Sequence, residues 1–177
     1  MITNLVPRFH PVSVADVQQL ATVARRAYAD HYLHLWHDGG VWYMNRSFSA
    51  DVLRREIEDR STRFYFVCLT NEPVGFLKLN INKPSPCNTE MNTLELERIY
   101  LEKKATGKGV GKASMQFAID QAKEAGNEFI WLKAMDTSHD ALAFYQRMGF
   151  EPCGTDRLSF DVMKESLRGM LVLQRRV

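Results

Sequence analysis

The sequence has no long hydrophobic run and almost no net charge. None of its apolar runs approaches the roughly 20 residues that a membrane-spanning helix needs. Its N-terminus lacks the basic start and the long apolar stretch of a signal peptide. The net charge is +2, and the basic residues are spread along the chain instead of forming one stripe. These absences predict a cytoplasmic protein whose main partner is neither a membrane nor a nucleic acid.

Cysteine is also scarce. Cys68, Cys87 and Cys153 are odd in number, lie far apart and form no Cys-x-x-Cys pair. This usage predicts reduced thiols instead of a disulfide framework. No neighbouring residue supplies the base or the lowered pKa that a catalytic cysteine needs, so we expect no chemistry from these thiols.

The length of 177 residues and the apolar share of 45% fit one domain that spans residues 1–177,. Apolar periodicity and turn signals predict helices over 17–28, 49–59, 109–125 and 138–148, with a loop over 82–92. Strands are expected over 8–12, 63–69, 74–81, 94–101, 129–135, 150–153 and 169–174. Helices therefore come first, then an antiparallel meander, then a strand-helix-strand-helix unit. This order predicts an α/β (α+β) chain with a mixed central sheet of six to seven strands, flanked by helices.

The most informative segment joins the strand 94–101 to the following helix. Gly107, Gly109 and Gly111 alternate there, so backbone N–H groups can crowd around a ligand without an intervening Cβ,. The helix start adds a partial positive charge, and Lys108 and Lys112 stand where acidic residues are usual. An external anion such as a pyrophosphate would complete this site. The letters fit neither a Walker A loop nor a dinucleotide fingerprint.

With this loop the sequence resembles the GNAT superfamily of acetyl-CoA-dependent N-acetyltransferases. The family's acetyl-CoA loop, Arg/Gln-x-x-Gly-x-Gly/Ala, aligns with Thr106–Gly111. The segment Leu94–Leu101 resembles the family's splayed central strand. Ala141–Phe150 is similar to its second signature, in which a helical Tyr precedes Gly-Phe. The resemblance covers residues 9–150, and the nearest likeness within the superfamily is to PaiA-like spermidine/spermine N-acetyltransferases.

The resemblance implies acetyl-CoA as co-substrate. Its pantetheine arm would pair with the backbone of the central strand, and its pyrophosphate would lie on the glycine loop; the implied contacts are Ile99, Tyr100, Leu101, Thr106, Gly107, Lys108, Gly109, Val110, Gly111 and Lys112. Two positions depart from the family pattern. Thr106 replaces a basic or amide residue, for which Lys103, Lys104 or Lys108 would compensate. Asp140 stands where the family often has Asn, and it either contacts the cofactor or caps its helix.

Acetyl transfer to an amine needs a neutral amine, a stabilised oxyanion and a proton for the departing thiolate. Tyr145 is the candidate acid, because a phenol can donate to a thiolate; the alternative is an interior tyrosine that only packs. Backbone N–H groups near Ile99–Leu101 are candidates for polarising the thioester carbonyl. Glu95 and Glu97 are candidate bases, and strand alternation predicts that both share a face with Ile99 and Leu101. Glu97 is favoured because it lies closer to the cofactor-binding end.

The stretch from 31 to 43, with its three histidines, is expected either to line the acceptor cleft or only to pack the first two helices onto the sheet. The candidate lining residues beside the histidines are Tyr28, Tyr32, Trp36, Trp42 and Tyr43. His31, His34 and His37 are spaced by three, which is too weak a signal for a metal site, and no metal is expected. The acceptor is expected to be a small-molecule amine. The resemblance and the mixture of aromatic and acidic residues suggest a polyamine. A non-catalytic acyl-CoA-binding regulator, a peptide or protein N-acetyltransferase and a homodimeric assembly stay open as alternatives.

Overall fold

Seven strands of the chain are seen in a computed structural model that describes residues 6–89 and 92–177. Glu90 and Met91, which belong to the loop predicted over 82–92, lie outside the described residues. The strands are β1 (Arg8–Pro11), β2 (Thr62–Leu69), β3 (Glu72–Asn80), β4 (Thr93–Leu101), β5 (Phe129–Met135), β6 (Glu151–Arg157) and β7 (Gly169–Arg176). They form one sheet in the order β1-β2-β3-β4-β5-β7-β6, in which β4 and β5 are parallel and all other pairs are antiparallel. This arrangement confirms the predicted α/β class and mixed sheet.

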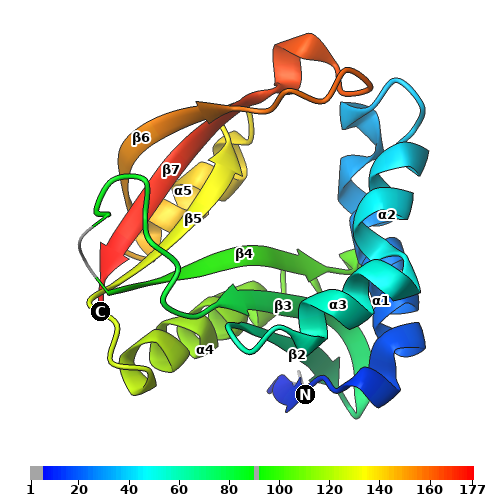
Figure 1. The fold of residues 1–177 in the computed structure, drawn as a ribbon, viewed down its shortest axis with the longest axis horizontal. Coiled ribbons are helices and arrows are strands. Elements are labelled where there is room, and N and C mark those ends of the chain that lie inside the picture. The colour runs from blue at the N-terminus through cyan, green and yellow to red at the C-terminus, as the bar shows by residue number, and fades with distance from the viewer. Residues whose placement is uncertain (1–5, 90–91) are drawn as a thin grey trace.

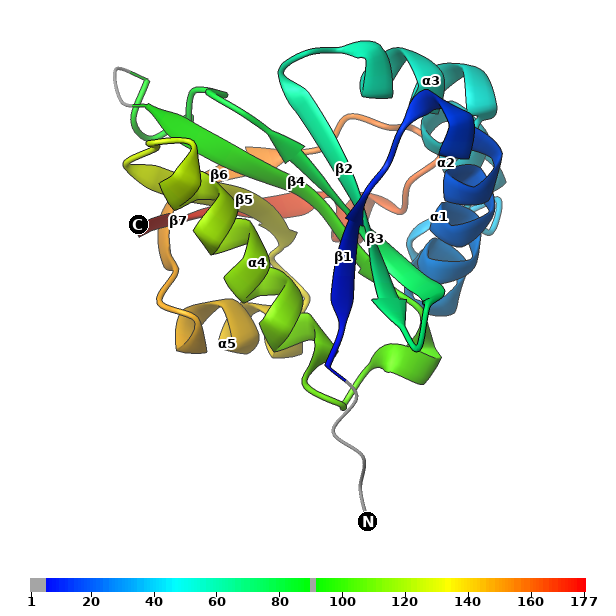
Figure 2. The same cartoon turned by 90° about the horizontal axis from the view of Figure 1, so that it is seen from below.

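Five α-helices of the described residues cover the sheet in two groups (Figures 1 and 2). They are α1 (Val17–Tyr32), α2 (Val41–Phe48), α3 (Ala50–Glu58), α4 (Val110–Glu124) and α5 (His139–Arg147). The first three lie on one face of the N-terminal strands, around the fully buried rings of Phe48 and Phe76. Helices α4 and α5 lie on the other face, over a cluster that includes Met115, Ile119 and Phe150. Helix α2 was not predicted, because its aromatic residues gave no clear 3.6-residue period.

The sheet splits between β4 and β5. These two strands pair only from Thr93 to Glu95 and from Phe129 to Trp131. Beyond that point β4 continues to Leu101 and β5 to Met135 without a ladder between them, and Figure 1 shows the two strands diverging. An open gap therefore lies in the middle of the sheet, bordered by unpaired backbone of β4.

A short bridge closes one end of this gap. The connection between β6 and β7 reaches the segment before α2, where Trp36 and Met163 form an isolated antiparallel bridge. The His37 N–H donates to the Val162 carbonyl and the Lys164 N–H donates to the Leu35 carbonyl, both at 2.9 Å. Two segments that are far apart in the sequence thus meet above the gap (Figure 1).

The prediction of reduced cysteines is wrong for two of the three. Cys87, in the loop before β4, forms a disulfide with Cys153 in β6, and only Cys68 is a free, buried thiol. The physical reason is the topology, since the loop packs over β5, β7 and β6: Trp131 Nε1 donates to the Lys83 carbonyl, and the Asn88 amide donates to Gln174.

Among the described helices, none combines the length and the apolar character that a bilayer crossing requires.

Candidate active site

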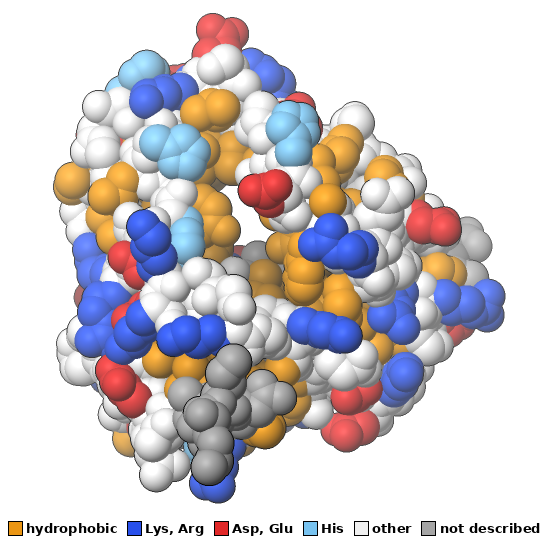
Figure 3. Space-filling model, turned by 180° about the vertical axis from the view of Figure 1, so that it is seen from behind, with side chains coloured by type: hydrophobic (Ala, Val, Ile, Leu, Met, Phe, Trp, Pro, Cys, Tyr) orange, Lys and Arg blue, Asp and Glu red, His pale blue; other side chains and the backbone are white. Residues whose placement is uncertain are grey.

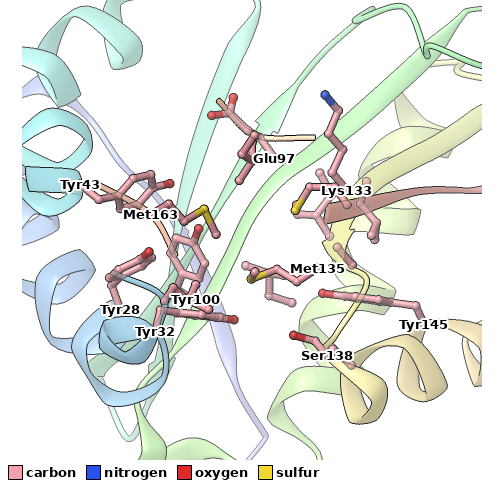
Figure 4. A pocket seen from close by; sticks show the side chains of 18 of the residues that line it. Tyr28, Tyr32, Tyr43, Glu97, Tyr100, Lys133, Met135, Ser138, Tyr145 and Met163 are labelled. Atoms are coloured by element: carbon pink, nitrogen blue, oxygen red, sulfur yellow. The ribbon is translucent and has the colours of Figure 1, made fainter. Parts of the chain in front are cut away.

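The gap between β4 and β5 holds a cleft with two unlike walls (Figure 4). One wall comes from α1, α2 and the segment between them. The other comes from β5, from α5 with the residue before it, and from the β6–β7 connection. Seen from behind, the cleft opens as a hollow framed by hydrophobic side chains, with Lys and Arg side chains on both sides of its lower rim (Figure 3).

Tyrosines dominate the first wall. The Tyr28 ring centroid lies 5.0 Å from that of Tyr32, 4.8 Å from that of Tyr43 and 5.5 Å from that of Tyr100. Trp36 stacks on Tyr43 at 4.8 Å, and its indole N–H donates to the Tyr28 hydroxyl at 2.7 Å. Burial raises the pKa values of Tyr28, Tyr32 and Tyr100, so these phenols stay neutral,. The result is an aromatic surface with several neutral hydroxyl groups.

Tyr145 stands on the opposite wall, on α5. Its ring packs beside Phe144 and Phe150, with centroids 5.5 and 6.2 Å away. Figure 4 shows its hydroxyl and that of Ser138 directed into the cleft toward Tyr32. Burial raises the Tyr145 pKa above its usual value, so the phenol keeps its proton at neutral pH,. Ser138, which begins α5 as its N-cap, was not predicted as a site residue because a lone serine carries no sequence signal.

Glu97 lines the cleft and belongs to a buried ion network. Its carboxylate lies 2.7 Å from Lys78 Nζ and 3.3 Å from the Arg98 guanidinium. Both cations also contact Glu56 of α3, at 3.0 and 2.8 Å. Burial alone would raise the Glu97 pKa, but Arg98 and Lys78 outweigh it and hold this pKa below its usual value,. Glu97 is therefore a fixed, ionised carboxylate.

Glu95 lies deeper and does not line the cleft. Its carboxylate accepts from the Asn80 amide at 2.7 Å, and the same amide nitrogen donates to Glu97 at 2.6 Å. Burial raises the Glu95 pKa, although the hydrogen bond from Asn80 opposes this effect. The Asn80 amide thus joins two carboxylates whose pKa values are shifted in opposite directions, upward for Glu95 and downward for Glu97.

The prediction that Glu95, Glu97, Ile99 and Leu101 share one strand face is wrong. Lys78 pairs with Arg98 and the next residue of β3, Leu79, pairs with Leu96, so Glu97 is an extra residue in β4. This β-bulge interrupts the alternation of side chains.

As a consequence, the two glutamates lie on the α3 side of the sheet, whereas Ile99 and Leu101 pack on the α4 side, in the cluster that includes Leu94 and Leu96. The ring of Tyr100 then points back into the tyrosine wall.

The glycine loop has the features of an open anion site. Gly107 and Gly109 have φ values of +71° and +78°, and a Cβ added at either would meet no atom within 4 Å. Helix α4 starts at Val110 without a capping side chain from the described residues, so its first N–H groups remain available,. Lys108 and Lys112 are exposed beside it. These residues fit a pyrophosphate.

Thr106 and Asp140, the two residues that depart from the family pattern, have different surroundings. The Thr106 hydroxyl donates to the Lys103 carbonyl at 2.8 Å, so this side chain is used within its own turn. The Lys104 ammonium lies 2.6 Å from Glu72 and 3.3 Å from Glu102, which leaves Lys103 and Lys108 as the less engaged cations. Asp140 is exposed in the first turn of α5 and is not its N-cap, which is Ser138.

The three histidines of the 31–43 stretch take different places. His31 Nε2 lies 2.9 Å from the Leu101 carbonyl oxygen, whereas His34 and His37 are exposed. None of the three lines the cleft, and neither does Trp42. Within residues 6–89 and 92–177, no group of three or more His, Cys, Asp or Glu side chains could hold a metal ion.

Comparison with known proteins gave four informative similarities. The sequence profile of the acetyltransferase (GNAT) family matches residues 20–150. An uncharacterized N-acetyltransferase from the pepI 3' region of Lactobacillus delbrueckii subsp. lactis is 27% identical over 164 residues, which cover 88% of this chain and 95% of that protein. Streptothricin acetyltransferase of Streptomyces lavendulae is 38% identical over 63 residues, or 36% of this chain and 33% of that protein. The crystal structure of the PaiA N-acetyltransferase of Thermoplasma acidophilum in complex with coenzyme A has the same fold, with a TM-score of 0.75 at 19% identity over 97% of this chain and 99% of that one.

Proposed function

The chain belongs to the acetyltransferase (GNAT) family, whose members are acetyl-CoA-dependent N-acetyltransferases, and from this premise we propose that it acetylates a primary amine of a small molecule, with Tyr145 as general acid. One observation carries the proposal: the hydroxyl of Tyr145 points into the cleft that the splayed strands leave open, and Glu97 lines the same cleft. A proton donor, Tyr145, and a proton acceptor, Glu97, thus lie near the unpaired backbone edge of β4.

The co-substrate fits two adjoining features. The backbone groups of Ile99 and Leu101 point to the open edge of β4, where a pantetheine arm can take the place of the missing strand, whereas Tyr100 between them faces its partner in β3,. The loop Thr106–Lys112 offers glycines, free N–H groups and two lysines for the pyrophosphate,. Because its side chain is exposed at the start of α5, Asp140 contributes at most a solvent-side contact to the arm.

The residues divide the chemistry between them. Acetyl-CoA supplies the acetyl group as a reactive thioester. Tyr145 holds a proton toward the departing sulfur and gives it up as the C–S bond breaks. Backbone N–H groups near Ile99–Leu101 donate to the carbonyl oxygen as negative charge develops on it. Glu97 receives, through water, the proton that the amine nitrogen loses on forming the amide, and Glu95 is the alternative base.

The size of the cleft supports a small acceptor. The bridge between Trp36 and Met163 closes one end, so an extended peptide could not pass across the tyrosine wall there. Tyr28, Tyr32 and Trp36 offer aromatic surface on which an aliphatic ammonium can lie,. This arrangement favours a small amine over the N-terminus of a protein.

Charge supports a polyamine only modestly. Glu56 and Glu97 pair with two buried cations, Lys78 and Arg98, and the neutral Asn80 amide links Glu97 to Glu95. With Glu95 ionised, this group carries a surplus of one negative charge. Lys133 also borders the cleft, but Asp156 pairs with it. A surplus of one charge suits one ammonium besides the reacting amine. We therefore propose a diamine or polyamine as acceptor, in agreement with the likeness to PaiA-like enzymes.

Turnover of acetyl-CoA with a panel of amines tests the proposal. Spermidine, spermine, a neutral-bodied monoamine, an amino acid, streptothricin and a short peptide should be compared at pH near 8, and again at higher salt. We expect the highest kcat/KM for the polyamines and a rise of their KM with salt, because exposed charge pairs are screened. Higher kcat/KM for monoamines would refute the polyamine assignment. Binding of acetyl-CoA without release of thiol for any amine would instead favour the non-catalytic regulator.

We further propose that residues 1–177 act as one N-acetyltransferase domain in the cytoplasm. The disulfide between Cys87 and Cys153 weighs against this location, since such bonds are rare there,. Counting free thiols in protein purified without reductant and under exclusion of oxygen tests this location. Two reactive thiols per chain besides Cys68 would agree with the cytoplasm. Sedimentation would decide whether the chain is a homodimer.

A further inference from the structure

Side chains of α1 hold consecutive residues at the point where β4 ends. His31 Nε2 lies 2.9 Å from the Leu101 carbonyl oxygen. The carboxylate of the neighbouring Asp30 accepts from the Lys103 backbone N–H at 2.7 Å. These contacts join residues that are 70 and 73 positions apart, and they fall immediately before the glycine loop.

A third contact completes this attachment. Arg26, one turn earlier on α1, donates from Nε to the nearly buried carboxylate of Glu102 at 3.0 Å, and a second guanidinium nitrogen lies 2.8 Å from the same carboxylate oxygen. The three residues Leu101, Glu102 and Lys103 are therefore each held once by α1. We call this set of contacts the α1 clamp, made by Arg26, Asp30 and His31.

The clamp acts on the backbone edge that faces the gap. The Glu102 N–H donates to the Val74 carbonyl at 2.7 Å, so Glu102 is a hydrogen-bonded position of the β3–β4 pair. In an antiparallel pair such positions alternate, so the backbone groups of Leu101 and Ile99 point away from β3, toward the gap. The Leu101 carbonyl would have no strand partner there, and His31 supplies one.

The hydrogen bond fixes the form of the imidazole. A carbonyl oxygen only accepts, so Nε2 of His31 must carry the hydrogen. This holds for the neutral Nε2–H tautomer and for the imidazolium alike. His31 therefore holds the peptide in either protonation state, and a glutamine, whose amide nitrogen can take the place of Nε2, can replace it as donor.

We propose that His31 is a positioning residue for acetyl-CoA. By fixing the Leu101 peptide it sets the direction of the backbone groups with which the pantetheine arm pairs, and with Asp30 it sets where the glycine loop begins. Helix α1 also carries Tyr28 and Tyr32 of the acceptor wall, so one helix aligns both halves of the site. The inference rests on the proposed placement of acetyl-CoA at Ile99–Lys112.

The test compares acetyl-CoA binding and kinetics in matched variants. His31→Ala should raise the acetyl-CoA dissociation constant and KM about three- to tenfold, the range expected for one hydrogen bond, with kcat reduced less than twofold. His31→Gln should restore both to within twofold of the parent value. His34→Ala removes an exposed imidazole just beyond the end of the same helix and should leave both unchanged.

Each result decides the inference. Unchanged acetyl-CoA affinity in His31→Ala would overturn it, and so would a loss that His31→Gln does not rescue, since shape and not the donor would then matter. If His31→Ala does not fold, Asp30→Ala at the exposed second contact should show the same selective loss of cofactor affinity. Gly109→Asp, measured in parallel, separates the two proposals: unchanged affinity in that variant would refute the placement of acetyl-CoA itself.

Discussion

Replacing Tyr145 with phenylalanine removes one hydroxyl group and nothing else. The ring keeps its contacts with Phe144 and Phe150. Among the described residues no side chain or backbone group bonds this hydroxyl, so its loss breaks no hydrogen bond. We expect the free energy of unfolding to change by less than about 0.5 kcal/mol, the usual range for a substitution away from packing and polar networks.

The effect on turnover should be far larger. General acids contribute about 10² to 10⁴ in rate, which is about 2.7 to 5.4 kcal/mol of barrier. Burial raises the Tyr145 pKa above the usual value near 10, whereas a thiol has a pKa of about 8.5. Complete proton transfer to the sulfur is therefore uphill in the empty cleft, which reduces the rate advantage that Tyr145 can give as an acid. We expect the lower end of the range, a loss of about 10² in kcat.

Release of coenzyme A, followed with a thiol-trapping reagent, measures this loss, and calorimetric titration should find the acetyl-CoA affinity nearly intact. Tyr65→Phe is the matched control, because its hydroxyl bonds Gln121 at 2.8 Å on the α4 side of the sheet. That variant should lose about 1 kcal/mol of stability and keep its kcat. A kcat loss below threefold in Tyr145→Phe would show that this tyrosine only packs.

Three further predictions follow from other parts of the site. Gly109→Asp adds a side chain at a φ of +78° and a negative charge at the anion site, and should raise the acetyl-CoA dissociation constant at least tenfold by calorimetry. Lys78→Met removes a cation that lowers the Glu97 pKa, so this pKa rises and the acidic limb of the kcat/KM profile moves to higher pH; an unmoved limb would contradict the role of Glu97. Melting experiments on the same variant should find about 3–5 kcal/mol less stability. Breaking the Cys87–Cys153 bond, which spans 66 positions, by Cys87→Ser should cost about 2–4 kcal/mol in the same assay.

Local patterns were sufficient for most of the fold. Apolar runs between turn signals located the seven strands, and Gly126 and Gly149, both with positive φ, follow the ends of α4 and α5, where glycine commonly terminates a helix,. The loop Gly107–Gly111 could also be recognised, because its backbone conformation depends on glycine itself. Features that are encoded within ten neighbouring residues could thus be predicted.

Features that depend on distant partners could not. The bulge at Glu97 arises from the register between β3 and β4, which no period within β4 reveals. The partner of Cys87 is 66 positions away, and that of His31 is 70 positions away. His31 looked like a lining residue because it stands among aromatic residues, yet its ring turns to the end of β4. Spacing along the chain carries no information about such contacts.

The acidic residues of β4 show how a local anomaly can still point to function. A central strand is normally apolar, and burying an ion pair brings little net stability because desolvation offsets the attraction. Yet Glu97 and Arg98 lie in the middle of this sheet and need Lys78 and Glu56 beside them. Packing alone would favour apolar residues at all four positions, so stability does not explain the network. The proposed role of Glu97 as a base would account for it, since Lys78 of β3 and Arg98 of β4 hold the Glu97 pKa down beside the cleft.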